Sequence, residues 1–298
     1  TPPPPPPPLL EPSAALHVLR LGNCGRCFGS RAVDSLVPFA ARLEVLSLGG
    51  SYKLTDEGLA RLLAASPRLH SLELRTNSRL GRAGLEAACR VPLLRSLSVD
   101  ECGQLEEEDL GALLELAPER RPPRAAVLQR LSLAKLPHVT DGLAAELLRL
   151  LGAGLRDLSL AECPALTDDT AVAIRTHCRA LQRLDVSGLP ELSTEGLLGL
   201  FISAGDAGGG AGAPRGSPGA AAAGSVGALE AVNLARLPAA TDDVVVEVAR
   251  AFGPSLREAH LGSCTHVTGR GLMALVRHCA QTLEVLDASM VRSFSDEV

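Results

Sequence analysis

Apolar residues recur along the chain in one spacing, apolar-x-x-apolar-x-apolar, with polar or small residues in most of the gaps. The first leucine of this frame returns at intervals of 27, 26, 25, 34, 27, 26, 48, 27 and 27 residues. Self-similarity at such a period is the signature of a solenoid, in which every repeat supplies the same elements. The ten starts are Leu16, Leu43, Leu69, Leu94, Leu128, Leu155, Leu181, Leu229, Leu256 and Leu283.

Each unit predicts a short strand followed by a helix. In the segment that begins at Leu155, alternation with period two places Leu158 and Leu160 inward and the serine between them outward. A threonine such as Thr167 can then cap a helix that ends near Cys178. We therefore expect an α/β fold, a right-handed leucine-rich-repeat solenoid (horseshoe) with a parallel concave β-sheet and convex helices.

Two intervals are longer than the rest, and both contain residues typical of loops. The first has three prolines within 118–123, which cannot extend a helix. In the second, residues 204–225 are almost wholly Gly, Ala, Pro and Ser, which predicts a disordered insertion. The proline run in 1–12 predicts a stiff linker, with a role as an SH3-type ligand as the alternative, and leaves 13–298 as the solenoid.

The residue eight positions after the first leucine is expected to lie where the chain turns out of the strand. A small polar or thiol side chain can satisfy backbone groups there. This position holds Cys24, Cys102, Cys163 and Cys264 in four repeats and Asn77 in another. Cys24 and Cys27 also form a CxxC pair, but a zinc or redox site needs further ligands or a thioredoxin-like context, so we expect a structural role.

Composition and charge narrow the classes of function. The 29 Lys and Arg residues against 34 Asp and Glu give a net charge of −5, which disfavours charge-driven binding of nucleic acid. The sequence lacks a signal-peptide core and any apolar run near the roughly 20 residues that cross a bilayer, which predicts a reducing intracellular compartment. It also lacks a G-x-S-x-G elbow, a P-loop and an HExxH pattern, so we expect no enzyme, cofactor or metal site.

The outward strand positions predict where a partner binds. The concave face is the default binding surface of a curved solenoid, although a solvated face is the simpler explanation for any one residue on it. The acidic bias of this strip would suit a basic protein bound by a monomeric chain. The candidate protein-binding residues are Glu73, Arg75, Asp100, Glu101, Asp157, Glu162 and Asp185.

The repeats resemble the cysteine-containing leucine-rich repeats typical of F-box substrate receptors of ubiquitin ligases. The pattern LxxLxLxxC-xx-LTD is met nearly in full from Leu155 to Asp168. The succession LSLAKLPHVTD, LRDLSLAECPALTDDTAVAIRTHC, LQRLDVSGLPELSTEGL, LREAHLGSCTHVTGRGLMALVRHC and SFSDEV is similar to Rad-seven-like nucleotide excision repair proteins. Leu136, Leu189 and Leu237 replace the turn cysteine in an alternation typical of that family.

The resemblance implies a protein-binding scaffold, the substrate-recognition part of a cullin-type ubiquitin ligase in global-genome nucleotide excision repair. It implies a Skp-type or elongin-C-type adaptor, a Swi/Snf-class ATPase as a further partner, and a nuclear rather than cytoplasmic location. The chain opens on Thr1 with its last repeat cut short, so we expect the adaptor to bind upstream sequence. The alternative is a leucine-rich-repeat adaptor in signalling or the cytoskeleton, outside the ubiquitin system.

Overall fold

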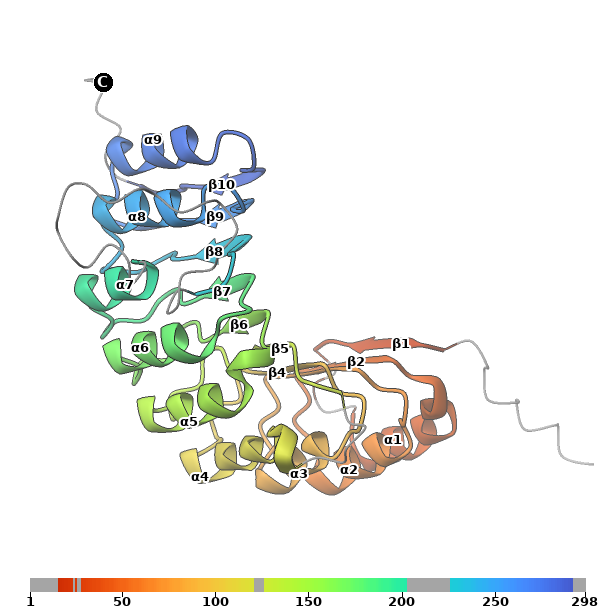
Figure 1. Cartoon of the computed structure of the whole chain (residues 1–298). Coiled ribbons are helices and arrows are strands. Elements are labelled where there is room, and N and C mark those ends of the chain that lie inside the picture. Colours follow the sequence, from red (N-terminus) through yellow and green to blue (C-terminus); the bar gives the residue numbers. More distant parts are fainter. Residues whose placement is uncertain (1–15, 24, 26–27, 121–125, 203–225, 292–298) are drawn as a thin grey trace, which may run out of the picture. The chain divides into compact units, whose positions relative to one another are not determined.

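The computed structural model describes residues 16–23, 25, 28–120, 126–202 and 226–291, in which strands and helices alternate along the chain (Figure 1). The chain consists of two compact units, Thr1–Val127 and Leu128–Val298. The boundary between them falls in the first of the two long intervals of the repeat frame. The predicted linker at 1–12 and the predicted insertion at 204–225 lie outside the described residues.

The first unit contains repeats one to four. Its elements are β1 (Val18–Leu21), α1 (Ser30–Leu36), the 3-10 helix η1 (Val37–Arg42), β2 (Val45–Gly49), α2 (Asp56–Ala64), β3 (Ser71–Arg75), α3 (Arg82–Cys89), β4 (Ser96–Asp100), α4 (Glu107–Leu110), η2 (Gly111–Leu116) and η3 (Pro118–Arg120). Strands β1 to β4 pair in chain order, and each pair is parallel. Repeat four departs from the expected pattern, because its short α-helix continues as a tighter 3-10 helix before Pro118.

The second unit contains the remaining six repeats. Its elements are β5 (Arg130–Ser132), α5 (Asp141–Leu151), η4 (Gly152–Gly154), β6 (Asp157–Ser159), α6 (Asp168–His177), β7 (Arg183–Asp185), α7 (Thr194–Phe201), β8 (Ala231–Asn233), α8 (Asp242–Phe252), β9 (Glu258–His260), α9 (Gly269–His278) and β10 (Val285–Asp287). Strands β5 to β10 also pair in parallel and in chain order. In each unit the helices stack along one side of the sheet (Figure 1).

The repeat frame sets the strands and the core. Every strand begins two residues after the first leucine of its repeat, so the predicted parallel sheet is confirmed. Leu131, Leu158 and Leu184 lie in register on β5, β6 and β7, and each is at most 2% exposed. These side chains face the helices, which leaves the residues between the inward-facing apolar residues on the opposite, open face of the sheet.

The helix starts confirm the predicted threonine caps. The hydroxyls of Thr55, Thr140 and Thr167 accept hydrogen bonds from the first-turn amides of α2, α5 and α6. Cys178 and Cys279 cap the carboxyl ends of α6 and α9, also as predicted. Each repeat therefore has its own start and stop signals, which is why the period survives in the structure.

Strand pairing and helix packing continue across the long interval between repeats seven and eight. Arg183, Leu184 and Asp185 of β7 pair in register with residues 231–233 of β8. On the helix side, the rings of Phe201 in α7 and Phe252 in α8 meet edge to face, with centroids 6.0 Å apart. The 48-residue interval thus separates two repeats in sequence but leaves them adjacent in the second unit.

Candidate functional site

The open face of each sheet carries the polar side chains that the strand pattern predicts. The residues between the second and third apolar positions of each repeat are partly exposed, whereas their strand neighbours inside the sheet are mostly buried. This confirms their outward placement. They are Arg20, Ser47, Glu73 and Ser98 in the first unit, and Ser132, Ser159, Asp185, Asn233, His260 and Asp287 in the second.

A row of left-handed residues follows the strands at the edge of the open face. In every repeat the seventh residue after the first leucine has a φ between 52° and 65°, and eight of the ten are not glycine. For a residue with a Cβ, this conformation costs about 1–2 kcal/mol. This row was not predicted from the sequence, although glycine at two of the positions is a signal of it. The row holds Asn23, Gly50, Thr76, Glu101, Lys135, Glu162, Gly188, Arg236, Ser263 and Met290.

The turn residues next to that row bind the backbone of the preceding repeat, as predicted for this position. The thiols of Cys163 and Cys264 each donate to a carbonyl oxygen at 3.0 Å, that of Leu133 and that of Leu234. The side-chain amide of Asn77 donates to the Leu48 carbonyl at 2.9 Å. Cys163 and Cys264 are therefore buried hydrogen-bond donors that connect one repeat to the next.

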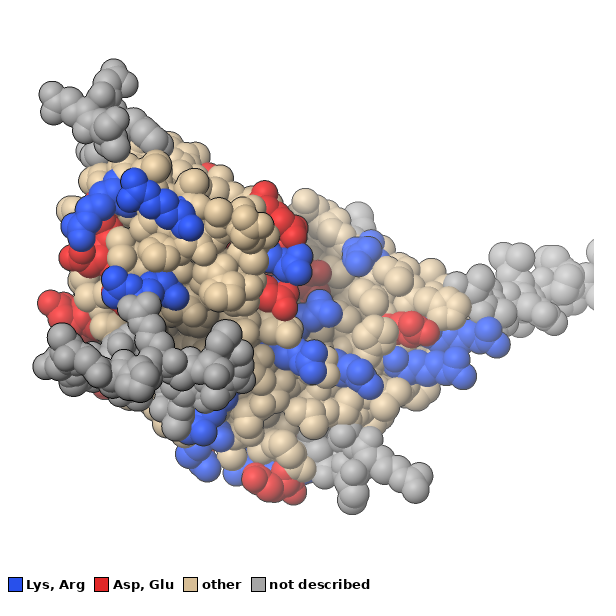
Figure 2. Space-filling model, turned by 45° about the horizontal axis from the view of Figure 1, so that its top comes forward, with Lys and Arg blue, Asp and Glu red and all other residues tan. Residues whose placement is uncertain are grey.

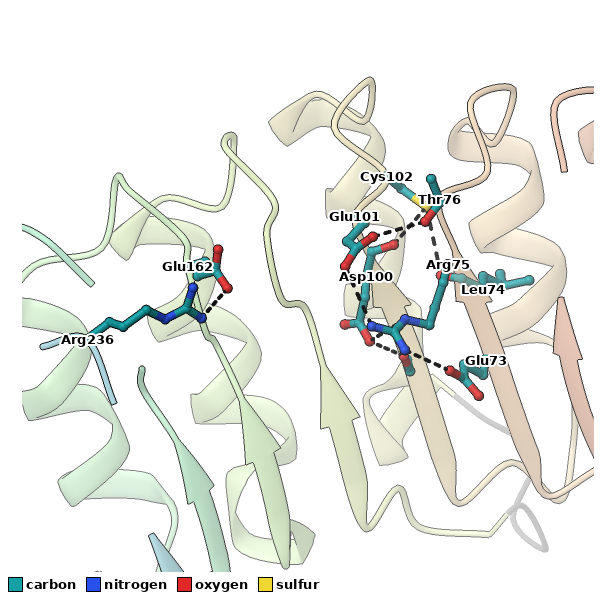
Figure 3. Close-up of polar contacts among 10 residues, drawn as sticks. Glu73, Leu74, Arg75, Thr76, Asp100, Glu101, Cys102, Glu162 and Arg236 are labelled. Carbon is teal, nitrogen blue, oxygen red and sulfur yellow. Dashed lines mark hydrogen bonds and ion pairs between the residues drawn. The ribbon is translucent and has the colours of Figure 1, made fainter. Parts of the chain in front are cut away.

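In the first unit, three candidate carboxylates surround Arg75 (Figure 3). Its guanidinium lies 3.7 Å from the Glu73 carboxylate, 4.0 Å from Asp100 and 3.6 Å from Glu101. The Thr76 hydroxyl also donates to Glu101 at 3.1 Å. Three carboxylates around one guanidinium leave this cluster with a net negative charge, as the sequence analysis expected for the binding strip.

Asp100 differs from the expectation that all the candidate side chains point into solvent. Its side chain is only 11% exposed, and it accepts a hydrogen bond from the Ser98 hydroxyl at 2.6 Å. It lies at the end of β4, in register with Arg75 of β3, where the neighbouring strand shields it. Sequence periodicity places a residue on a face but does not reveal the depth to which its neighbours cover it.

In the second unit, the candidate carboxylates lie beside arginines. Asp157 is in register with Arg130 on one side and Arg183 on the other. Glu162 forms a 2.6 Å ion pair with Arg236 from β8's turn, two repeats further along the sheet (Figure 3). Opposite charges on neighbouring strands stabilise a sheet, which applies to Asp157. Glu162 has its ion-pair partner two repeats away.

Asp185 has a local structural role. Its carboxylate accepts hydrogen bonds from the backbone amide and the hydroxyl of Ser187, at 3.0 and 2.7 Å. Asn233 and Asp287 make the same bond to the amide two residues later. An aspartate or asparagine here therefore shapes the turn that follows the strand.

These contacts correct the expectation of one acidic strip. Glu73, Arg75, Asp100 and Glu101 come together in the first unit, whereas Asp157, Glu162 and Asp185 belong to the second. There, Arg130, Arg183 and Arg236 lie beside Asp157 and Glu162. Figure 2 likewise shows arginines and lysines in several separate groups, with Asp and Glu beside some of them. The acidic character is a property of the Arg75 cluster and not of the whole row.

Burial sets the chemistry of the cysteines. It raises the pKa of the Cys178 thiol to about 12. Burial, with the nearby Asp100 and Glu101 charges adding to it, raises the pKa of Cys102 to about 11 despite hydrogen bonds from backbone amides. The six cysteines of the described residues are free thiols, and Cys24 and Cys27 of the CxxC pair lie outside them. The Cys102 and Cys178 thiols are thus protonated at neutral pH.

The described residues contain no group of three or more His, Cys, Asp or Glu side chains placed to hold a metal ion. Among the helices that the structure describes, none has the length and apolar character needed to cross a bilayer.

Comparisons with known proteins place the fold. No protein-family model matches the sequence, and no curated protein matches it. The crystal structure of the Rad7 and Elc1 complex in yeast matches with a TM-score of 0.55 and 16% identity, covering 85% of this chain and 67% of that chain. A TLR13–ssRNA13 complex matches with a TM-score of 0.42 and 11% identity, covering 88% of this chain and 34% of that chain. The chain is a leucine-rich-repeat solenoid, similar in fold to Rad7.

Proposed function

We propose that this chain is a non-enzymatic protein-binding scaffold and the substrate-recognition part of a cullin-type ubiquitin ligase. The observation that carries the proposal is the likeness of fold to Rad7, which was crystallised with Elc1, over 85% of this chain. The alternation of cysteine and leucine at the turn position supports the same family. The solenoid supplies an extended polar face on which a folded protein can be held.

The adaptor of the proposed ligase is of the elongin-C type, to which Elc1 belongs, or of the Skp type. If the resemblance to repair proteins extends to function, the chain acts in the nucleus, in global-genome nucleotide excision repair, with a Swi/Snf-class ATPase. This finer assignment rests on the order of the repeat motifs.

Affinity capture from cells tests the proposal. The full-length protein is tagged at its own locus and purified, and its partners are identified by quantitative mass spectrometry, before and after ultraviolet irradiation. We expect a cullin together with one class of adaptor, and the class recovered decides between the elongin-C and Skp types. Recovery of neither adaptor class would favour a scaffold outside the ubiquitin system.

We further propose that the Arg75 cluster contributes to holding a basic segment of the substrate, because its three carboxylates outnumber its one guanidinium. Charge pairing on an exposed surface raises association rates more than equilibrium affinity. Glu73→Lys with Glu101→Lys should therefore slow substrate capture at low salt. Asp100 is left unchanged in this test, since it is nearly buried and its reversal would disturb the fold.

A further inference from the structure

A hollow lies at the start of β5, β6 and β7 in the second unit. It has a volume of about 370 Å³ and is lined by Gln129, Arg130, Arg156, Asp157, Gln182 and Arg183. These residues form two neighbouring rows, where a row is one repeat position followed across successive strands. Each of the three strands contributes its first residue to one row and the residue just before it to the other. Every lining side chain is polar or charged, so the hollow is built for a charged or hydrogen-bonding ligand.

The charge of the hollow is positive, in contrast with the Arg75 cluster. Its lining has three guanidinium groups and one carboxylate. All three arginines are exposed residues. Within the described ranges, the one ion-pair contact of Arg183 is a distant one, 4.0 Å from Glu258. Among the described residues, no carboxylate lies within 4.0 Å of Arg130 or Arg156.

The positive region ends at β8. The two rows continue there with Glu230 and Ala231. In the next two repeats, Glu258 and Glu284 occupy the same rows, next to Arg257. Arg257 of the same row forms a 2.6 Å ion pair with Glu284. Within the described part of the second unit, the open guanidinium groups of these two rows are thus confined to β5–β7, which limits an anionic ligand to that part of the unit.

We propose that this hollow binds an acidic segment of a protein partner, with Arg130, Arg156 and Arg183 each pairing with an Asp or Glu carboxylate. Guanidinium groups present donors in a fork that matches a carboxylate. The side-chain amides of Gln129 and Gln182 add neutral donors for the backbone of the segment. The inference rests on the proposed scaffold function and names the chemistry of one substrate feature.

The arrangement favours several carboxylates over one phosphate group. Neighbouring strands lie about 4.8 Å apart, so Arg130 and Arg183 belong to strands roughly 10 Å apart. That separation suits charges distributed along an extended chain. Asp157 lies between them, in register with both, so a single phosphate group that bridged the two guanidinium groups would also meet this carboxylate.

Peptide binding by the purified full chain tests the proposal. Three fluorescein-labelled peptides of twelve residues are compared by anisotropy: one with Glu and Asp alternating with Ser and Gly, its Gln and Asn counterpart, and a phosphoserine version of the neutral peptide. We expect the carboxylate peptide to bind at least about tenfold more tightly than either of the other two. Its affinity should fall as NaCl rises from 50 to 300 mM, as expected for exposed charge pairs.

Two variants locate the binding site. Arg130→Gln with Arg156→Gln and Arg183→Gln should weaken binding of the carboxylate peptide at least about tenfold, the combined effect expected of three exposed pairs. Asp157→Asn should strengthen it several-fold, because this change removes the competing carboxylate. A merely structural role of these residues would not produce a gain in affinity from Asp157→Asn.

The matched control changes the same net charge on the helix side. It replaces three arginines of α5, α8 and α9 with glutamine: Arg149, Arg250 and Arg270. This control should retain the affinity of the wild type. Equal binding of all three peptides, preference for the phosphoserine peptide, or equal loss in the control would overturn the proposal. None of these outcomes bears on capture of a cullin adaptor in cells, so the two proposals fail separately.

Discussion

Asp141 shows how one side chain joins two repeats. From the first turn of α5, its carboxylate accepts bonds from the Thr167 amide at 3.0 Å and the Thr167 hydroxyl at 2.7 Å. The Thr170 hydroxyl adds a third bond at 2.5 Å. Asp168 and Asp242 make the same pair of bonds to the cap residue of the next repeat. The aspartate of the LTD motif therefore holds the following helix cap, rather than capping its own helix.

This arrangement predicts a pH-dependent contribution to stability. Burial alone would raise the pKa of Asp141, but the bonds from Thr167 and Thr170 outweigh it and lower the pKa. A lowered pKa means that the carboxylate stabilises the fold above about pH 4, its unfolded pKa, and that this stabilisation is lost as the pH falls through the folded pKa. Asp141→Asn should reduce the free energy of unfolding by about 1–2 kcal/mol at pH 7.

Urea unfolding at pH 7 and pH 3 measures this effect, and the difference between Asp141→Asn and the wild type should narrow at pH 3. Asp169→Asn is the matched control, since it also removes a first-turn carboxylate, one with no hydrogen-bond donor among the described residues. The control should change stability by less than about 0.5 kcal/mol. Equal effects of the two variants would contradict a special role of the Asp141 bonds.

The raised pKa values of the buried cysteines predict slow thiol chemistry. In a variant with Cys24→Ser and Cys27→Ser, the remaining six thiols should stay unreactive toward Ellman's reagent at pH 8 in the native protein. They should react rapidly in 6 M guanidinium chloride. The reason is that the thiolate is the nucleophile, and burial keeps the Cys102 and Cys178 thiols protonated. Fast native labelling of either residue would show that the turn or the helix end is open.

At the scale of elements, the strand core and the long interval should differ sharply in their importance for stability. The Leu160 side chain is 2% exposed, so Leu160→Ala should lower the free energy of unfolding by about 2–5 kcal/mol through the cavity it leaves. Deleting 204–225 should change it by less than about 1 kcal/mol, because loop length affects closure entropy only slowly. The β7–β8 pairing and the Phe201–Phe252 contact lie outside the deleted segment.

Chemical unfolding of both variants checks this prediction. The deletion leaves five residues between Phe201 and Leu229, compared with three between Phe252 and Leu256 in the next repeat. The shortened connection therefore has enough length to close. A deletion variant less stable than Leu160→Ala would mean that the segment contributes to the packed structure.

The periodic elements could be predicted from the sequence, because local spacing determines them. The strand starts, the threonine caps and the cysteine turns follow from residues within one repeat. The burial of Asp100, the Glu162–Arg236 pair and the Asp141 bonds could not be predicted in the same way. Each depends on contacts between residues 25 to 74 positions apart, and a repeat frame gives the row of a residue but not its partner.

For the same reason, the sequence did not show which acidic residues of the predicted strip have arginines beside them. Counting Asp157, Glu162 and Asp185 along the sequence gave an acidic row. In the structure, register places arginines beside Asp157, an ion pair joins Glu162 to Arg236, and Asp185 accepts hydrogen bonds from Ser187 in the turn that follows it. The arginine hollow was not predicted for the same reason. Its three arginines occupy two different repeat positions and come together only across neighbouring strands.

At the scale of the whole molecule, the order of strand pairing predicts how far the effect of a destabilising substitution extends along the solenoid. Among the described residues, each strand pairs only with the strands next to it in sequence, as expected of a quasi-one-dimensional fold. Stability should then depend on each repeat and on the interfaces to its neighbours, and local opening should be confined to a few repeats. Leu160→Ala should accordingly lower protection most in β6, less in β5 and β7, and least at β10.

Hydrogen exchange followed by mass spectrometry measures this gradient. Peptides that contain β5 to β7 should exchange faster in Leu160→Ala than in the wild type, while those from β2 and β3 of the first unit should keep their rates. The matched variant Leu72→Ala, at a 1% exposed position of β3, should give the reverse pattern. The chain divides into two compact units, Thr1–Val127 and Leu128–Val298, so each variant should act mainly within its own unit. If either substitution raised exchange uniformly from β1 to β10, the two units would unfold as one cooperative body, and the repeat-by-repeat account of stability would be wrong.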